Sequence, residues 1–148
     1  MKTRSQTHEI ELQVPPERVF DVLITPSAIR DWWGAHRAAV MPEQGGWWVA
    51  AWGEREDDPD YVTGAIIRVF DRPHRLVLAY ENYYAKAGRL PFDANMSVEF
   101  LIERHQSGTR LRLTQDGFPA EPVADAYYEG CRQGWQATLS GIKRLITA

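Results

Sequence analysis

The stretch from Gly117 to Ala148 predicts one long amphipathic helix, and this helix limits how the rest of the chain can fold. Pro122 suits the first helical turn, because proline has a fixed φ and no N–H to satisfy. About 25 residues would make a rod of roughly 38 Å, which only a broad surface such as a sheet can cover. Around Trp135, apolar residues recur at the helical period on one face: Ala124, Tyr128, Cys131, Leu139, Ile142 and Ile146.

A second feature of this predicted helix is a flank of glycines. Gly130, Gly134 and Gly141 lie on one side of the apolar face. Each glycine costs about 1 kcal/mol relative to alanine inside a helix, so the bare flank predicts a close neighbour. We expect that neighbour to belong to the same chain, although a ligand or the second subunit of a homodimer would use the same space.

Composition is that of one globular domain spanning residues 1–148, with 44% hydrophobic and 25% charged residues. The net charge of −3 gives no electrostatic reason to expect a nucleic-acid or membrane partner. Cys131 is the only cysteine, which excludes an internal disulfide and fits a reducing compartment. Met1 to Ser5 is polar and leads into no apolar run, so we expect a cytoplasmic protein without a signal peptide.

The region before the helix predicts mostly antiparallel strands. One strand comes first, and two short helices follow it, starting at Pro16 and Pro26. Alternation and turn residues then predict strands over 38–41, 47–52, 61–70, 75–81, 96–103 and 109–114, after the first strand at 8–14. The predicted fold is α+β: a bent antiparallel sheet of about six or seven strands around the long C-terminal helix.

Specific segments in this order resemble the START-like, helix-grip superfamily (SRPBCC). Within it, the chain resembles the bacterial domain similar to the C-terminal part of the activator of the ninety-kilodalton heat-shock-protein ATPase. The segments that carry the resemblance are 14–20, Trp32-Trp33, Gly45-Gly46, Gly64 with Ile66, Asp71 and Pro73, 75–77, Gly108-Thr109, 111–114, Gly117-Phe118, Gly134-Trp135 and 139–145. The resemblance implies a sheet that grips the C-terminal helix over an apolar cavity, in a superfamily whose members bind lipids, sterols or polyketides and include a few enzymes.

Alternation also predicts which side chains face that cavity. Trp48 and Trp52 lie on one face of their strand and Trp47 on the other, and the next strands send alternate residues inward toward the helix. A pocket walled by aromatic and thioether groups suits a small apolar ligand, although the same side chains would also serve as an ordinary core. The candidate ligand-binding residues are Trp33, Trp48, Trp52, Tyr80, Met96, Phe100, Tyr128, Cys131 and Trp135.

No metal, cofactor or catalytic residue is predicted. The four histidines are scattered and have no metal-ligand spacing with each other or with Cys131. In an apolar stripe the thiol of Cys131 should have a raised pKa, whereas a nucleophile needs a lowered one and a base, for which His36 is the candidate. Asp31 and Glu54 follow or adjoin the tryptophan clusters and are the carboxylates best placed to reach a cavity mouth.

Three functions remain open from the sequence. The first is binding or carriage of a small hydrophobic molecule (lipid, sterol or polyketide-like) without catalysis, by a monomer or homodimer. The second is an enzyme resembling polyketide cyclases or aromatases, in which polar groups in the cavity move protons. The third is a protein-interaction domain that stimulates a chaperone ATPase, which only the resemblance suggests. Ionisable groups inside the cavity would favour the second, and a large exposed apolar patch the third.

Overall fold

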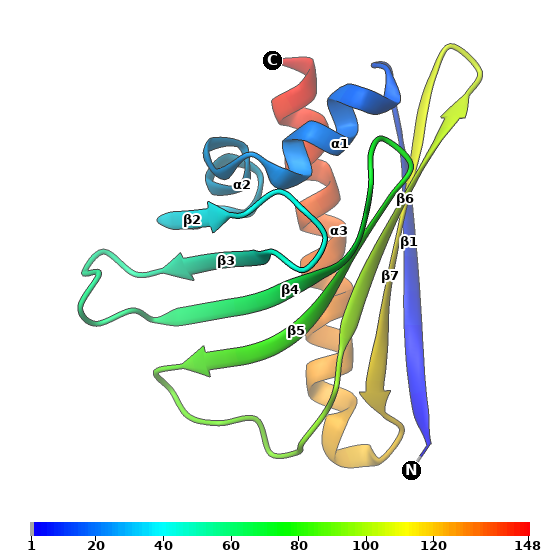
Figure 1. The fold of residues 1–148 in the computed structure, drawn as a ribbon. Helices are drawn as coiled ribbons and strands as arrows, with labels where there is room; N and C mark the ends of the chain where they lie inside the picture. The colour runs from blue at the N-terminus through cyan, green and yellow to red at the C-terminus, as the bar shows by residue number, and fades with distance from the viewer. Residues whose placement is uncertain (1) are drawn as a thin grey trace.

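The structure, a computed structural model, describes residues 2–148, so Met1 of the expected single domain lies outside it. Three α-helices and seven strands make up the fold (Figure 1). In chain order the elements are β1 (Thr3–Leu12), α1 (Pro16–Ile24), α2 (Pro26–Trp33), β2 (Arg37–Val40), β3 (Trp47–Trp52), β4 (Tyr61–Asp71), β5 (Arg75–Ala85), β6 (Ser97–His105), β7 (Gly108–Pro119), the 3₁₀ turn η1 (Pro122–Ala124) and α3 (Asp125–Thr147).

All seven strands form one antiparallel sheet with the order β1-β7-β6-β5-β4-β3-β2. Strands β2 to β7 are each paired with their neighbour in sequence, and β1 closes the order by pairing with β7. The long helix α3 runs across one face of this sheet, and α1 and α2 lie near the end of α3 where the chain terminates (Figure 1). The α+β fold expected from the sequence is therefore confirmed.

The local sequence explains where the short helices begin and end. Both start with a proline, Pro16 in α1 and Pro26 in α2, as their sequence predicts. Gly34 caps the C-terminal end of α2 with a φ of 71°, a left-handed conformation that glycine adopts without strain. This ending leaves Trp33 as the last residue of α2, beside the strands that follow.

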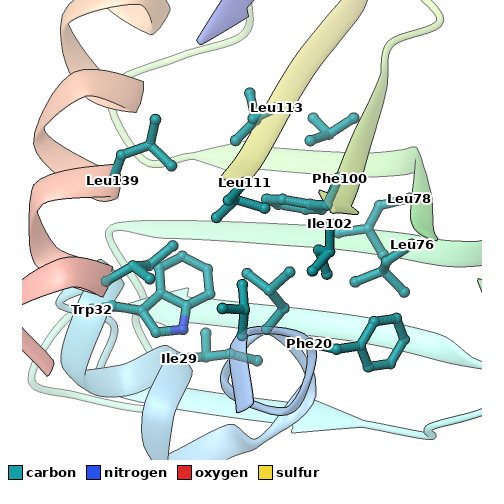
Figure 2. Close-up of a cluster of buried hydrophobic side chains, with 14 of the residues drawn as sticks. Phe20, Ile29, Trp32, Leu76, Leu78, Phe100, Ile102, Leu111, Leu113 and Leu139 are labelled. Carbon is teal, nitrogen blue, oxygen red and sulfur yellow. The ribbon is translucent and has the colours of Figure 1, made fainter. Parts of the chain in front are cut away.

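The core fills the space between the sheet and the end of the molecule that the three helices cover. In Figure 2, Phe20 from α1, Ile29 from α2 and Leu139 from α3 converge on strand residues such as Leu111 and Leu78. Two buried indoles in this region also find polar partners. The Trp32 N–H donates to the Val22 carbonyl at 2.7 Å, and the Trp48 N–H donates to the Leu23 carbonyl at 3.0 Å. The first bond joins α2 to α1, and the second attaches α1 to the sheet at β3.

Three boundaries differ most from those expected, and the others shift by at most two residues. β1 begins at Thr3 instead of residue 8, because its polar first half pairs with β7, a partner that local alternation does not reveal. β5 continues to Ala85 instead of residue 81, beyond an irregularity in its pairing with β4 that interrupts the alternation. Gly117 lies in β7 and not at the start of the helix, with its φ of 96° and its backbone packed against the Asn95 carbonyl.

Candidate functional site

A cavity of about 1210 Å³ lies against the first half of α3. Its other walls come from the end of α2, from the adjoining parts of β3, β4 and β5, from Gln115 on β7, and from the connection after β5. Neither α1 nor the C-terminal end of α3 contributes to the lining. The cavity therefore occupies the part of the α3–sheet space that the core leaves unfilled.

Most of the residues expected at the ligand site line this cavity. They are Trp33, Trp52, Tyr80, Met96, Cys131 and Trp135. They come from five separate elements or connections, so only the bent sheet and the helix across it bring them together. That they contact a ligand remains a prediction.

Trp48, Phe100 and Tyr128 do not line the cavity, so the position expected for them is wrong. Trp48 is only 1% exposed because it fills the core below Trp33, and Phe100 is packed beneath Trp135 with 6.4 Å between ring centroids. Tyr128 turns toward β1: its hydroxyl donates to the Ser5 carbonyl at 2.9 Å. Alternation gives the inner face for Trp48 and Phe100, which lie on strands, but not which part of that face the core covers. For Tyr128, a helical wheel cannot separate sides of the helix that are only a fraction of a turn apart.

Trp33 contacts both of the other tryptophans that line the cavity, Trp52 and Trp135, and these three indoles form its aromatic wall. Its ring centroid lies 4.8 Å from that of Trp52 in an edge-on arrangement, and 6.1 Å from that of Trp135 with an angle of 14° between the planes. The indole N–H of Trp52 donates to the Trp33 carbonyl at 3.4 Å. Edge-on and stacked contacts of this kind favour defined positions of aromatic side chains, so the three indoles support one another.

Gln115 is a polar residue at the base of the cavity that sequence reasoning missed. It is 2% exposed, accepts a hydrogen bond from the indole N–H of Trp135 at 2.6 Å, and directs its own amide toward the sulfur of Met96 at 3.3 Å. The sequence pattern could have identified Gln115, because Leu111 and Leu113 face inward and period-2 alternation places residue 115 on the same face. Gln115 thus fixes the orientation of two candidate ligand-binding side chains.

The glycine flank has two different surroundings. At Gly141, an added Cβ would lie 2.6 Å from the backbone oxygen of Trp32, so α2 is the close neighbour within the chain that the sequence predicted. At Gly130 and Gly134, an added Cβ would meet no atom within 4 Å, and both residues line the cavity. The expectation of close packing within the chain is correct for Gly141 and wrong for the other two.

Besides the exposed Tyr61, Tyr83 and Tyr84, three further lining residues carry hydroxyl groups that were not singled out from the sequence: Thr63, Tyr127 and Thr138. Thr63 is 9% exposed and Thr138 is 6% exposed. Thr138 follows Gly134 by one helical turn, so both face the same space. If the glycine flank of the helix had been interpreted as a cavity wall, the helical period would have placed Thr138 in the lining as well.

The titratable groups inside the cavity are held in their protonated forms. Burial raises the pKa of Tyr80 and of Tyr127, and the thiol of Cys131 raises both further. Burial also raises the pKa of the Cys131 thiol, against an opposing effect of the Tyr127 hydroxyl. The charged residues of the lining, Glu81, Arg89 and Asp93, are all exposed. The inner wall is therefore uncharged at neutral pH.

The residues weighed as acids or bases from the sequence lie elsewhere. Asp31, His36 and Glu54 are exposed and do not line the cavity. The ring of His36 accepts a hydrogen bond from the Gly53 backbone N–H at 3.0 Å, so its Nδ1 has a structural partner. Within residues 2–148, no three histidine, cysteine, aspartate or glutamate side chains are grouped as a metal site would need, and no helix is long and apolar enough to cross a membrane.

Comparison with solved structures supports the fold over almost the whole chain. Protein MLL2253 from Mesorhizobium loti is 22% identical, with 97% of each chain covered and a TM-score of 0.79. Protein CV1439 from Chromobacterium violaceum is 19% identical, with 97% of this chain and 98% of that chain covered and a TM-score of 0.74. The Aha1 dimer from Colwellia psychrerythraea, known from a solution structure, is 12% identical over 97% of this chain and 96% of that one, with a TM-score of 0.75.

Family comparison covers the same region, although no curated protein matches the chain. The family described as "Activator of Hsp90 ATPase homolog 1-like protein" matches residues 13–147. This range begins at the end of β1 and includes every lining residue of the cavity. The resemblance noted in the sequence is thereby confirmed, and the chain belongs to the family of Activator of Hsp90 ATPase homolog 1-like proteins.

Proposed function

We propose that this protein binds and carries a small hydrophobic molecule in the cavity between the sheet and α3, without chemical conversion. The cavity itself is the observation that carries the proposal. Its volume of about 1210 Å³ exceeds what a packed core of ordinary side chains leaves empty. It also lies just above the range of about 300–1,000 Å³ typical of ligand pockets. Aromatic and thioether side chains wall it, as a small apolar ligand requires.

The chemistry of the wall favours binding over catalysis. A general base must be unprotonated near neutral pH, and a cysteine nucleophile needs a lowered pKa. The pKa values of Tyr80, Tyr127 and Cys131 are shifted in the opposite direction by burial. The exposed Glu81 and Asp93 at the rim have no such burial. The upward pKa shifts of the three buried groups count against a cyclase- or aromatase-like enzyme.

One observation bears on the alternative of a protein-interaction domain. On the face of the sheet away from α3, Met41, Trp47 and Ile66 are each at least 37% exposed, and Trp47 and Ile66 are directly paired across β3 and β4. Exposed apolar clusters often mark partner sites. The family description suggests a chaperone ATPase as the partner. If the unmodified protein stimulates such an ATPase and a Trp47→Ser variant does not, the result would support this second function. A protein-interaction role does not account for the cavity.

The decisive experiment for ligand carriage is native mass spectrometry of freshly purified protein, before and after extraction with organic solvent. A bound molecule from the expression host appears as added mass that extraction removes, and its fragmentation gives its chemical class. Diverse fatty acids, sterols and aromatic polyketides are then titrated into the extracted protein. Saturable quenching of tryptophan emission is expected, because Trp33, Trp52 and Trp135 line the cavity.

A matched pair of variants on α3 gives the control. Cys131→Trp places a large ring where a partly buried residue lines the cavity, whereas Gln133→Trp places the same ring on an exposed position outside it. Loss of co-purified mass and of quenching in Cys131→Trp alone supports carriage in this cavity. Equal retention in both variants, or no bound molecule and no saturable titration in the unmodified protein, overturns the proposal.

A further inference from the structure

The first half of α3 is attached to the edge strand β1 by polar contacts. The Gln6 amide donates to the Tyr128 carbonyl at 3.0 Å, and the Tyr128 hydroxyl donates to the Ser5 carbonyl at 2.9 Å. Arg4 donates to the Asp125 carboxylate at 2.5 Å, and its guanidinium carbon lies 4.4 Å from the centre of the Tyr128 ring. We call these contacts the β1–α3 seam. Another side of the same half of the helix borders the cavity, so the seam is an important part of what holds this half to the sheet.

His8 supports the glutamine at the centre of this seam. Gln6 is 6% exposed, and because its amide nitrogen faces Tyr128, its side-chain oxygen faces the Nε2 atom of His8 at 2.8 Å. A carbonyl oxygen can only accept a hydrogen bond, so the hydrogen of the neutral ring must sit on Nε2 of His8. The half-buried histidine therefore fixes the orientation of the side chain that binds α3.

The surroundings of His8 disfavour a second proton on its ring. Burial and the positive charge of Arg132 on α3 keep the pKa of His8 below its ordinary value of 6.5. Arg132 donates from its Nε to Glu129 at 2.9 Å, and this bond lowers the pKa of the Glu129 carboxyl, which therefore keeps its charge in mild acid. On β7, the residue paired with His8 is the apolar Leu113. His8 is therefore a group at the seam whose charge changes below neutral pH.

Arg4 indicates that the seam has little excess stability. Its Nε atom is buried and has no hydrogen-bond partner among residues 2–148. A buried N–H group without a partner is costly. Arg4 and Asp125, the charged pair of the seam, lie nearer the start of their two elements than His8 and Arg132 do. A modest extra cost at His8 is therefore enough to separate this part of α3 from β1.

We propose that protonation of His8 releases the first half of α3 from β1 and so opens the cavity. Above pH 6.5, His8 is neutral and the seam is closed. As the pH falls below 6.5, the released state takes up a proton more readily than the closed state, because its imidazole is in water and away from Arg132. The ring turns outward, the Gln6 oxygen loses its donor, and the bond from Gln6 to Tyr128 weakens. The second half of α3 stays in place, because the core holds it.

The test is hydrogen–deuterium exchange of the full chain at about pH 7.5 and about pH 5, with mass spectrometry and correction for the pH dependence of chemical exchange. Amides of residues 126–134 are expected to lose protection by about threefold or more in acid, as an unfavourable charge pair near the surface can cause, whereas amides of residues 139–146 keep theirs. An equal loss in both halves, or unchanged protection in the first half, would overturn the proposal. Neither result bears on the carrier function, which the mass measurement of bound ligand tests separately.

A matched pair of histidine variants identifies the group that titrates. His8→Gln keeps a donor for the Gln6 oxygen but cannot be protonated, so it should abolish the loss of protection in acid. His74→Gln, on the exposed turn between β4 and β5, should respond like the unmodified protein. Arg132→Gln removes the facing charge and should reduce the loss. Thermal melts confirm that each variant is folded. An undiminished loss of protection in folded His8→Gln would refute the switch.

Discussion

The two halves of α3 belong to one continuous helix but have different surroundings. In the C-terminal half, Leu139 and Ile142 are buried in the core, and Gly141 lets the backbone of α2 approach. In the first half, Gly130 and Gly134 face an open cavity. The two short helices make the difference, because both lie toward the end of α3 where the chain terminates (Figure 1). The same sequence device, a glycine beside an apolar stripe, thus serves packing in one half and open space in the other.

Trp135 joins the two halves, and its removal should have the largest effect. It is 7% exposed, stacks on Trp33 and donates its indole N–H to Gln115. Trp135→Ala is expected to lower the free energy of unfolding by about 3–5 kcal/mol, since it leaves a large void and an unpaired buried amide. Urea denaturation measures the change. A loss below about 1 kcal/mol would mean that the cavity side of α3 relaxes freely, and the division into two halves would need revision.

Leucine and cysteine truncations sharpen the comparison. Leu139→Ala removes a side chain that is 4% exposed in the closed half and should cost about 2–5 kcal/mol. Cys131→Ala removes one atom that faces the open cavity and should cost less than about 1 kcal/mol. Equal losses in denaturant melts would show that the first half of α3 is as tightly packed as the second.

The glycines give a matched pair on one helix. Gly141→Val should destabilise the protein by about 1–3 kcal/mol, because the new Cβ meets the rigid Trp32 carbonyl. Gly134→Val should leave stability unchanged or raise it by a few tenths of a kcal/mol, because valine is the better helix former and the space is open. Size-exclusion chromatography with light scattering accompanies the melts. A homodimer that dissociates in Gly134→Val would assign this flank to a subunit interface instead of a ligand.

The smallest effect is expected from the phenols of the open half. The folded pKa values of Tyr80 and Tyr127 lie above their ordinary value of 10.0 because of burial. Their protonated forms therefore favour the folded state: this contribution is complete below pH 10.0 and is lost as pH rises toward the folded pKa values. Tyr80→Phe should make the decline of stability above that pH less steep. An unchanged slope in melts between neutral and alkaline pH would show that water enters the cavity freely.

The cavity lining shows how far local patterns reach. Period-2 alternation placed Trp48 and Trp52 on the inner face and Trp47 on the outer, and the structure agrees, with Trp47 43% and Trp48 1% exposed. Alternation could not tell that Trp48 lies under the helical layer and Trp52 beyond it. That distinction depends on where α2 crosses the sheet, which is set by contacts between segments far apart in the chain.

The sequence by itself determined the elements, their order and their buried faces, because helix starts, turns and periodicities are local properties. Its resemblance to a family also proved correct. Only the tertiary structure decided that the core stops partway along α3, since this follows from the lengths and positions of α1 and α2 relative to the sheet. That stopping point divides the glycine flank and assigns Tyr128 to β1, whereas Tyr127 and Thr138 line the cavity. Neighbours one residue apart on a helix take different roles here because burial is decided by what packs across from them.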